Sequence, residues 1–346
     1  MACSLTEFSV RIADICVRLR LPAKVLSAPI PEVYQAFRCL TPSSANPDVD
    51  ILVRVEPPPP VQGRLVFSSG TLWRLYDHDG VIQIASFAPA LGNRVDIEDA
   101  DLGDRRGVET PRRGVSAGGA QLLPRPVHSP QMVMDRLAIF RNGFTSGELY
   151  ESPDFLEARG RATTGVFPLS YPLDELLFIN LLGQGRGAEL HGCGVSMDGD
   201  GLLFIGASGA GKSTISQLMA ARPGTVVLSD DRTIVRRTHG RWRIYGTPWH
   251  GTARAYSATG AELKGIFVLR HAPANEARRL TRVQAAAALV ARSFPTYWDP
   301  AGMKYTLGLV EEITSAMPIY DLGFAPTEAC VDFVRGLTAA GKAGVA

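Results

Sequence analysis

The chain has 346 residues, of which 45% are apolar and 20% charged, so it is long enough for two domains or for one large domain with an appended lobe. Its formal net charge of +2 is too small to indicate nucleic acid or an acidic membrane surface as the main partner. The cysteines are widely spaced and include no C-x-x-C pair, which argues against a disulfide framework and a zinc site and favours the reducing cytoplasm.

The first hundred residues contain short stretches typical of strands, separated by proline-rich breaks. Apolar and polar residues alternate in the second half of Glu7–Leu21, and the β-branched run Ile51–Val55 ends before Pro57–Pro60. Further short strands are predicted over 65–67, 72–76 and 81–85, with a hairpin turn at 77–80. The pattern predicts an N-terminal β-rich lobe over residues 1–100, which has no catalytic spacing and is a candidate for recognising a substrate or partner.

Residues 101–130 differ in composition from both flanking regions. They are rich in Gly, Pro and Arg and nearly free of aromatic residues, which predicts a flexible linker. Its arginine pairs at 105–106 and 112–113 either bind a phosphorylated or acidic partner or are solvated charges. A helix is predicted from Pro130 to about Phe140, at the start of a second domain over 131–340.

The strongest apolar stretch, over 173–182, has a helical spacing of its apolar residues. It carries Asp174 and Glu175 and is too short to cross a bilayer, and the start of the chain lacks the features of a signal peptide. These features predict a cytoplasmic protein with no membrane partner. From Ala188 onward strands and helices alternate, which predicts an α/β core over 173–335.

A phosphate-binding motif lies inside this core. The run Gly206-Ala-Ser-Gly-Ala-Gly-Lys-Ser213 satisfies G-x-x-x-x-G-K-[ST], and it follows a predicted strand at 202–205 and opens a predicted helix at 212–221. Glycines let successive N–H groups converge on a phosphate, and the helix N-terminus adds partial positive charge. Lys212 is expected to reach the β- and γ-phosphates and Ser213 to ligate Mg²⁺. The alternative is a plain glycine turn.

The predicted nucleotide-binding residues are therefore Gly206, Ala207, Ser208, Gly209, Ala210, Gly211, Lys212, Ser213 and Thr214. A short strand predicted over 225–229 ends in Asp230 and Asp231. One carboxylate beside a phosphate loop can anchor the metal and a second can accept a proton from an attacking hydroxyl. Adjacent side chains on a regular strand face opposite ways, so the pair needs an irregular strand end to converge. The alternative is an ordinary turn.

Other polar residues of the core have two interpretations each. His191 lies near a strand end if 194–197 pairs with 202–205 through the turn at 198–201, and such a histidine is more often structural. The segment Gly246–Gly251 is either a substrate-facing loop, presenting Thr247, Trp249 and His250, or a tight turn with Trp249 in the core. It follows a hairpin predicted from 232–236 and 241–245. Lys264 and Arg270 are either transition-state cations or surface charges.

Towards the carboxyl terminus, an Ala-rich helix is predicted over 281–292. A capped terminal helix is predicted from Thr327 to Gly336.

The order of these features resembles the HPr kinase/phosphorylase group, which shares its P-loop core with PEP carboxykinases. His191 precedes the phosphate loop, and the two aspartates follow it after only a helix and a strand. The segments Tyr245–Gly251 and Met317–Phe324 are similar to those of HPr-kinase-related proteins, so the resemblance covers roughly 173–335. It implies an α/β fold whose P-loop core is PEP carboxykinase-like, a mixed sheet with flanking helices, beside the N-terminal β-rich lobe.

The resemblance also implies an activity, namely transfer of the γ-phosphoryl group of ATP, with Mg²⁺, to a Ser or Thr hydroxyl of a protein or peptide by an enzyme that assembles as a homo-oligomer. It assigns Lys212 to the phosphates, Ser213 and Asp230 to the metal, Asp231 to the general base and His191 to positioning the transferred group or the metal. The chain lacks the R-G-L-G-type segment of the bacterial HPr enzymes, so neither HPr nor the reverse phosphorolysis is implied. The alternatives are a nucleotide-binding regulatory protein without phosphotransfer and a small-molecule kinase.

Overall fold

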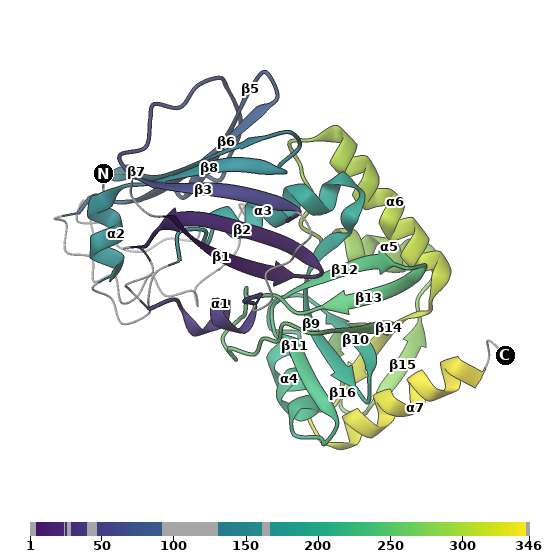
Figure 1. Cartoon of the computed structure of the whole chain (residues 1–346). Coiled ribbons are helices and arrows are strands. Elements are labelled where there is room, and N and C mark those ends of the chain that lie inside the picture. The colour runs from purple at the N-terminus through teal and green to yellow at the C-terminus, as the bar shows by residue number, and fades with distance from the viewer. Residues whose placement is uncertain are drawn as a thin grey trace, which may run out of the picture.

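The protein combines two large mixed sheets with flanking helices (Figure 1). The computed structural model describes residues 5–23, 25, 29–39, 47–91, 131–160 and 167–343. The linker predicted over 101–130 lies outside these residues. None of the helices in the described ranges is both long and apolar enough to cross a membrane.

The first sheet has eight strands in the order β1-β2-β3-β8-β7-β6-β5-β4. Its strands are β1 (Leu5–Ile12), β2 (Ile15–Pro22), β3 (Val49–Val55), β4 (Arg64–Ser68), β5 (Trp73–His78), β6 (Val81–Pro89), β7 (Met132–Arg141) and β8 (Ser146–Glu151). Two short helices, α1 (Glu32–Ala36) and α2 (Pro153–Gly160), accompany it. β3 pairs in parallel with β2 and with β8, and the other neighbours are antiparallel. The strands predicted within residues 51–85 are confirmed.

The helix predicted from Pro130 to Phe140 is wrong, because this segment forms β7. Its backbone pairs with β6 on one side and β8 on the other, and Leu137 and Phe140 are buried in the core. A short apolar run has no periodicity that separates a buried helix from a buried strand, so its distant partners decide. β7 and β8 thus extend the first sheet to residue 151, and the predicted division into domains at residue 131 stays a prediction.

The second sheet contains β9 (Ala188–Met197), β10 (Asp200–Ile205), β11 (Thr225–Ser229), β12 (Arg232–Thr238), β13 (Arg241–Tyr245), β14 (Gly260–His271), β15 (Glu276–Arg279) and β16 (Ile319–Phe324). Its order is β10-β9-β12-β13-β14-β16-β15, with β11 on β9 and an additional pairing of β10 with β14. β10, β14 and β16 are parallel, so their carboxyl ends share one edge of the sheet. The predicted hairpins that turn at 198–201 and that join 232–236 to 241–245 are confirmed.

Helices cover both faces of the second sheet (Figure 1). They are α3 (Leu173–Leu181), the π-helical turn η3 (Leu182–Arg186), α4 (Lys212–Ala220), α5 (Arg282–Val290), α6 (Pro300–Ala316) and α7 (Ala329–Ala343). Apolar residues of α5 and α6 pack in one core cluster with the strands, and those of α4 and α7 pack in another. The predicted end of the terminal helix at Gly336 is wrong, because α7 continues to Ala343 and Gly336 lies inside it.

Contacts between the two sheets centre on α3. All residues of this helix are buried, and a single core cluster joins its side chains to strands of the first sheet and to Ile234 and Trp249 beyond it. Tyr34 of α1 donates a hydrogen bond to Asp174 (2.7 Å), and Tyr245 donates one to Asp14 (2.6 Å). The first sheet is therefore packed directly against the part of the chain that carries the phosphate loop.

Candidate functional site

The phosphate loop connects the end of β10 to the start of α4. Gly209 and Gly211 have φ values of 77° and 98°, in the left-handed region that favours glycine. A Cβ on Gly211 would lie 2.5 Å from the Phe324 ring, and one on Gly206 would lie 2.8 Å from the Cβ of Ala210. α4 begins at Lys212 without a side-chain cap. The loop therefore leaves backbone N–H groups at the start of α4 available to an anion.

Lys212 folds back along this loop. Its Nζ donates to the carbonyl oxygens of Gly206 (3.2 Å) and Ala207 (3.4 Å). Burial lowers the pKa of the Lys212 ammonium group; the charge of Asp231 opposes this shift, and that of Arg292 adds to it. The pKa of Lys212 thus depends on charges of residues that are far away in the sequence.

The carboxyl ends of β14 and β16 support the loop from the side. His271 Nε2 lies 2.7 Å from the carbonyl oxygen of Gly209, and its ring stacks on Phe324, with 6.0 Å between the ring centroids. The loop thus lies at the carboxyl edge of the parallel strands, where α/β proteins commonly bind ligands.

His191 and Asp231 form a pair whose charges influence Lys212. His191 Nε2 lies 3.3 Å from Asp231 Oδ1, while Asp231 Oδ2 accepts a hydrogen bond from Arg232 Nη1 at 2.9 Å. The antiparallel pairing of β9 with β12 places His191 opposite Arg232. Burial, and then the positive charge of Lys212, lower the pKa of His191 from 6.5 to about 4, so its imidazole is neutral near pH 7.

Asp230 and Asp231 follow an irregular strand end, where the register of β11 against β9 shifts. Ser229 Oγ accepts hydrogen bonds from the N–H groups of Asp231 and Arg232. Asp230 is buried, however, and its two oxygens accept the N–H groups of Gly251 (2.8 Å) and Ala253 (2.9 Å). The two carboxylates therefore have different surroundings: Asp230 holds the loop after Gly251, and Asp231 faces His191.

The polar and aromatic side chains of the segment Gly246–Gly251 are buried, as expected for a tight turn with Trp249 in the core. Trp249 is 1% exposed and donates through Nε1 to Asp174 Oδ2 (2.7 Å). Thr247 is fully buried and donates to the carbonyl oxygen of Arg232 (2.7 Å), and His250 is also buried. The interpretation of these side chains as substrate-facing is wrong.

Lys264 and Arg270 are surface charges rather than members of the site. Lys264 forms an ion pair with Glu262, and Arg270 forms ion pairs with Glu276 and Asp321.

Two arginines outside the predicted site complete the charged cluster. Arg292 lies just after α5; its charge lowers the pKa of His191 and of Lys212, and its carbonyl oxygen accepts the N–H of His191 (2.7 Å). Arg232 also binds Glu175 Oε1 (3.1 Å), and its guanidinium lies over the Phe294 ring at 4.3 Å. Neither arginine belongs to a motif, so no local signal could have identified them.

The described residues contain no group of three or more His, Cys, Asp or Glu side chains that could hold a metal ion. Protein-bound Mg²⁺ commonly takes only one or two protein ligands and completes its shell with phosphates and water. Ser213 is exposed at the start of α4, and each Asp230 oxygen accepts one N–H group and keeps a lone pair. A hydroxyl and a carboxylate are donor types that Mg²⁺ accepts beside phosphate oxygens.

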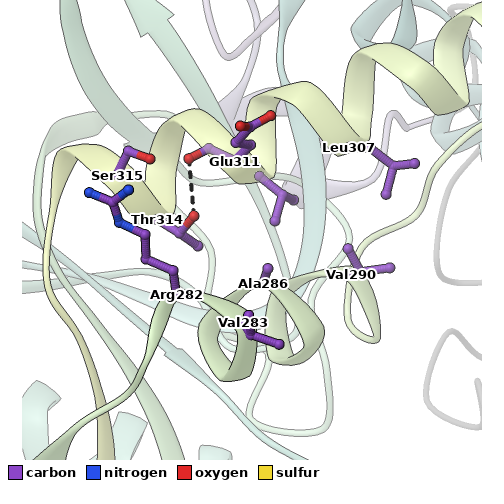
Figure 2. Close-up of a pocket in the computed structure, with 9 residues that line it drawn as sticks. Arg282, Val283, Ala286, Val290, Leu307, Glu311, Thr314 and Ser315 are labelled. Atoms are coloured by element: carbon purple, nitrogen blue, oxygen red, sulfur yellow. Dashed lines mark hydrogen bonds between the residues drawn. The ribbon is translucent and has the colours of Figure 1, made fainter.

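Two cavities lie away from this cluster, on different flanks of α6. The one in Figure 2 has a volume of about 300 Å³ and lies between α5 and α6, and Val283 and Ala286 of α5 and Leu307 of α6 line it. The other, of about 510 Å³, lies between α6 and the β12–β13 hairpin. Neither contains a residue of the phosphate loop.

No protein-family model matches the chain. No curated protein shows significant similarity to it.

Proposed function

We propose that this chain is an ATP- and Mg²⁺-dependent, cytoplasmic kinase of the HPr-kinase-like type, which transfers the γ-phosphoryl group to a Ser or Thr hydroxyl of a protein or peptide. One observation carries the proposal: the lysine of a phosphate loop shares its electrostatic environment with the Asp231–His191 pair. A phosphate loop alone is sufficient for nucleotide binding. A carboxylate and a neutral imidazole beside its lysine supply what transfer needs in addition.

The binding half of the site is the loop with its cations. The N–H groups at the start of α4 and the Lys212 ammonium group would contact the β- and γ-phosphates. Arg292 adds a further positive charge beside Lys212. Because negative charge must be neutralised as the phosphoryl group moves, positioned cations of this kind lower the barrier.

The acceptor half of the site is Asp231. Arg232 holds its Oδ2 atom, and Oδ1 lies on the side of His191. In this arrangement Asp231 accepts the proton of the acceptor hydroxyl, and neutral His191 helps to orient the carboxylate and the transferred group. Mg²⁺ would be held by Ser213 and Asp230 and would supply charge neutralisation on the phosphates.

The PEP carboxykinase-like fold of the core belongs to the same proposal. It is supported by a P-loop that follows β10, a strand parallel to β14 in a mixed sheet, and by an aspartate pair separated from the loop only by α4 and β11. The N-terminal sheet, which packs against α3, is the proposed recognition surface for the acceptor.

The test is phosphoryl transfer from labelled ATP with Mg²⁺ to a pool of Ser- and Thr-containing peptides. Asp231→Asn should lower transfer by at least about a hundredfold while calorimetry still detects nucleotide binding, because only the base is lost. Labelling of metabolites but not of peptides would indicate a small-molecule kinase, and binding without any transfer would indicate a regulatory protein. Absence of Mg-ATP binding by the folded protein would refute the proposal.

A further inference from the structure

The larger cavity is a groove between α6 and the β12–β13 hairpin, with a volume of about 510 Å³. Trp242 of β13 lines it on the sheet side, and Tyr305 and Leu309 line it on the helix side. Arg237 of β12 and Lys304 of α6 add positive charge. Its volume is in the range of sites for small organic ligands.

Two aromatic residues line this groove, and Tyr305 is the more exposed of the two. Trp242 is largely buried, with the Arg237 guanidinium 6.0 Å from its ring, and Tyr305 is half-buried. Aromatic walls of this kind favour a ligand with a flat or branched apolar body, because stacking adds to the burial of apolar area.

The charges at the rim favour an anion. Arg237 is paired with Glu312 at 3.3 Å, so these two charges compensate one another. Lys304 is exposed and forms no ion pair with any residue that the structure describes. One uncompensated cation beside an apolar wall matches a ligand that carries one negative group.

Gly308 keeps the groove open on the side of α6. Glycine lowers the stability of a helix interior relative to alanine. A Cβ at Gly308 would meet no atom within 4 Å, so packing does not require glycine there. Because Gly308 lines the groove, a large side chain at this position is expected to reduce the space available to a ligand.

We infer that this groove binds an organic anion that combines an aromatic body with a single carboxylate. The site is distinct from the proposed kinase centre: β12 begins at Arg232, which holds Asp231, and Arg237 lies about 16 Å further along the strand. The ligand stacks on Tyr305 and packs beside Trp242, and its carboxylate pairs with Lys304. A free carboxylic acid and the carboxyl terminus of a polypeptide both have this chemistry.

The test uses N-acetylphenylalanine as the probe, with calorimetry and tryptophan fluorescence as readouts. The wild-type protein should bind it at least about tenfold more tightly than N-acetylphenylalanine amide, which lacks the charge. Gly308→Leu should abolish binding, whereas Gly336→Leu should not: Gly336 is also a helical glycine with no atom within 4 Å of a Cβ, but it lies in α7. Lys304→Met should weaken binding and Lys304→Arg should restore it, which tests the site even if Gly308→Leu fails to fold.

A short peptide that ends in phenylalanine identifies the source of the ligand. Tighter binding of this peptide indicates a polypeptide terminus, and tighter binding of the free acid indicates a small molecule; both support the site. Equal affinities of the acid for wild type and the folded Gly308→Leu variant would overturn the inference, as would failure of both the acid and the peptide to bind.

Discussion

Replacing Arg232 by methionine tests the buried charge cluster beneath the proposed kinase centre. The Arg232 side chain is 9% exposed and contacts three carboxylates, those of Asp231 (2.9 Å), Glu175 (3.1 Å) and Glu189 (3.5 Å). Methionine keeps most of the length of the side chain but removes its charge and its hydrogen-bond donors. Glu175 and Glu189 would remain buried without this cation, and Asp231 would lose the group that orients it.

The expected magnitude follows from burial. Removing one partner of a buried ion pair costs about 3–5 kcal/mol, because the remaining charge is left uncompensated. Arg237→Met is the matched control: Arg237 lies on the same strand, but its side chain is 57% exposed and it pairs with an exposed glutamate, Glu312. Exposed pairs contribute less than about 1 kcal/mol.

The assay is urea unfolding of both variants and the wild type, followed by tryptophan fluorescence, with the slope of the transition checked for constancy. Arg232→Met should lose several times more free energy of unfolding than Arg237→Met. It should also lose phosphoryl transfer under conditions in which it is folded. Similar losses of stability in the two variants would refute the reasoning that the buried cluster stabilises the core around Arg232.

Three further variants test other parts of the site. Gly211→Ala should weaken Mg-ATP binding in calorimetry by at least about tenfold, because its Cβ would lie 2.5 Å from Phe324. Gly209→Ala, whose Cβ meets nothing within 4 Å, should weaken binding less, and the reverse order would contradict the loop geometry. Because the pKa of His191 is lowered from 6.5 to about 4, its contribution to stability is complete above pH 6.5 and is lost as the pH falls towards 4. Thermal unfolding of His191→Gln should therefore show a smaller loss of stability between pH 7 and 5 than wild type; an equal loss would rule out this assignment. Asp230→Asn should loosen the backbone at Gly251 and Ala253, detected as faster limited proteolysis there, and unchanged cleavage would argue against its anchoring role.

Features that depend on neighbouring residues could be predicted from the amino-acid sequence. The phosphate loop, its strand and its helix follow from one short run of residues, as do the hairpin turns at 77–80 and 198–201. Glycine at Gly211 is required by a backbone angle that the motif itself imposes, although its close contact with Phe324 depends on the tertiary structure. Such features are stabilised by local backbone geometry, so they can be predicted without knowledge of the tertiary structure.

Tertiary structure alone decided which side chains meet. β7 became a strand because β6 and β8 pair with it, and Trp249 became a core residue because Asp174 accepts its N–H. Arg292 joined the charged cluster through a backbone hydrogen bond from His191, on a strand that lies far away in the sequence. Tertiary packing also gives the two aspartates different partners: Asp230 accepts the N–H groups of Gly251 and Ala253, and Asp231 lies beside His191. These outcomes depend on desolvation and charge contributed by distant segments, and no spacing within one segment encodes them.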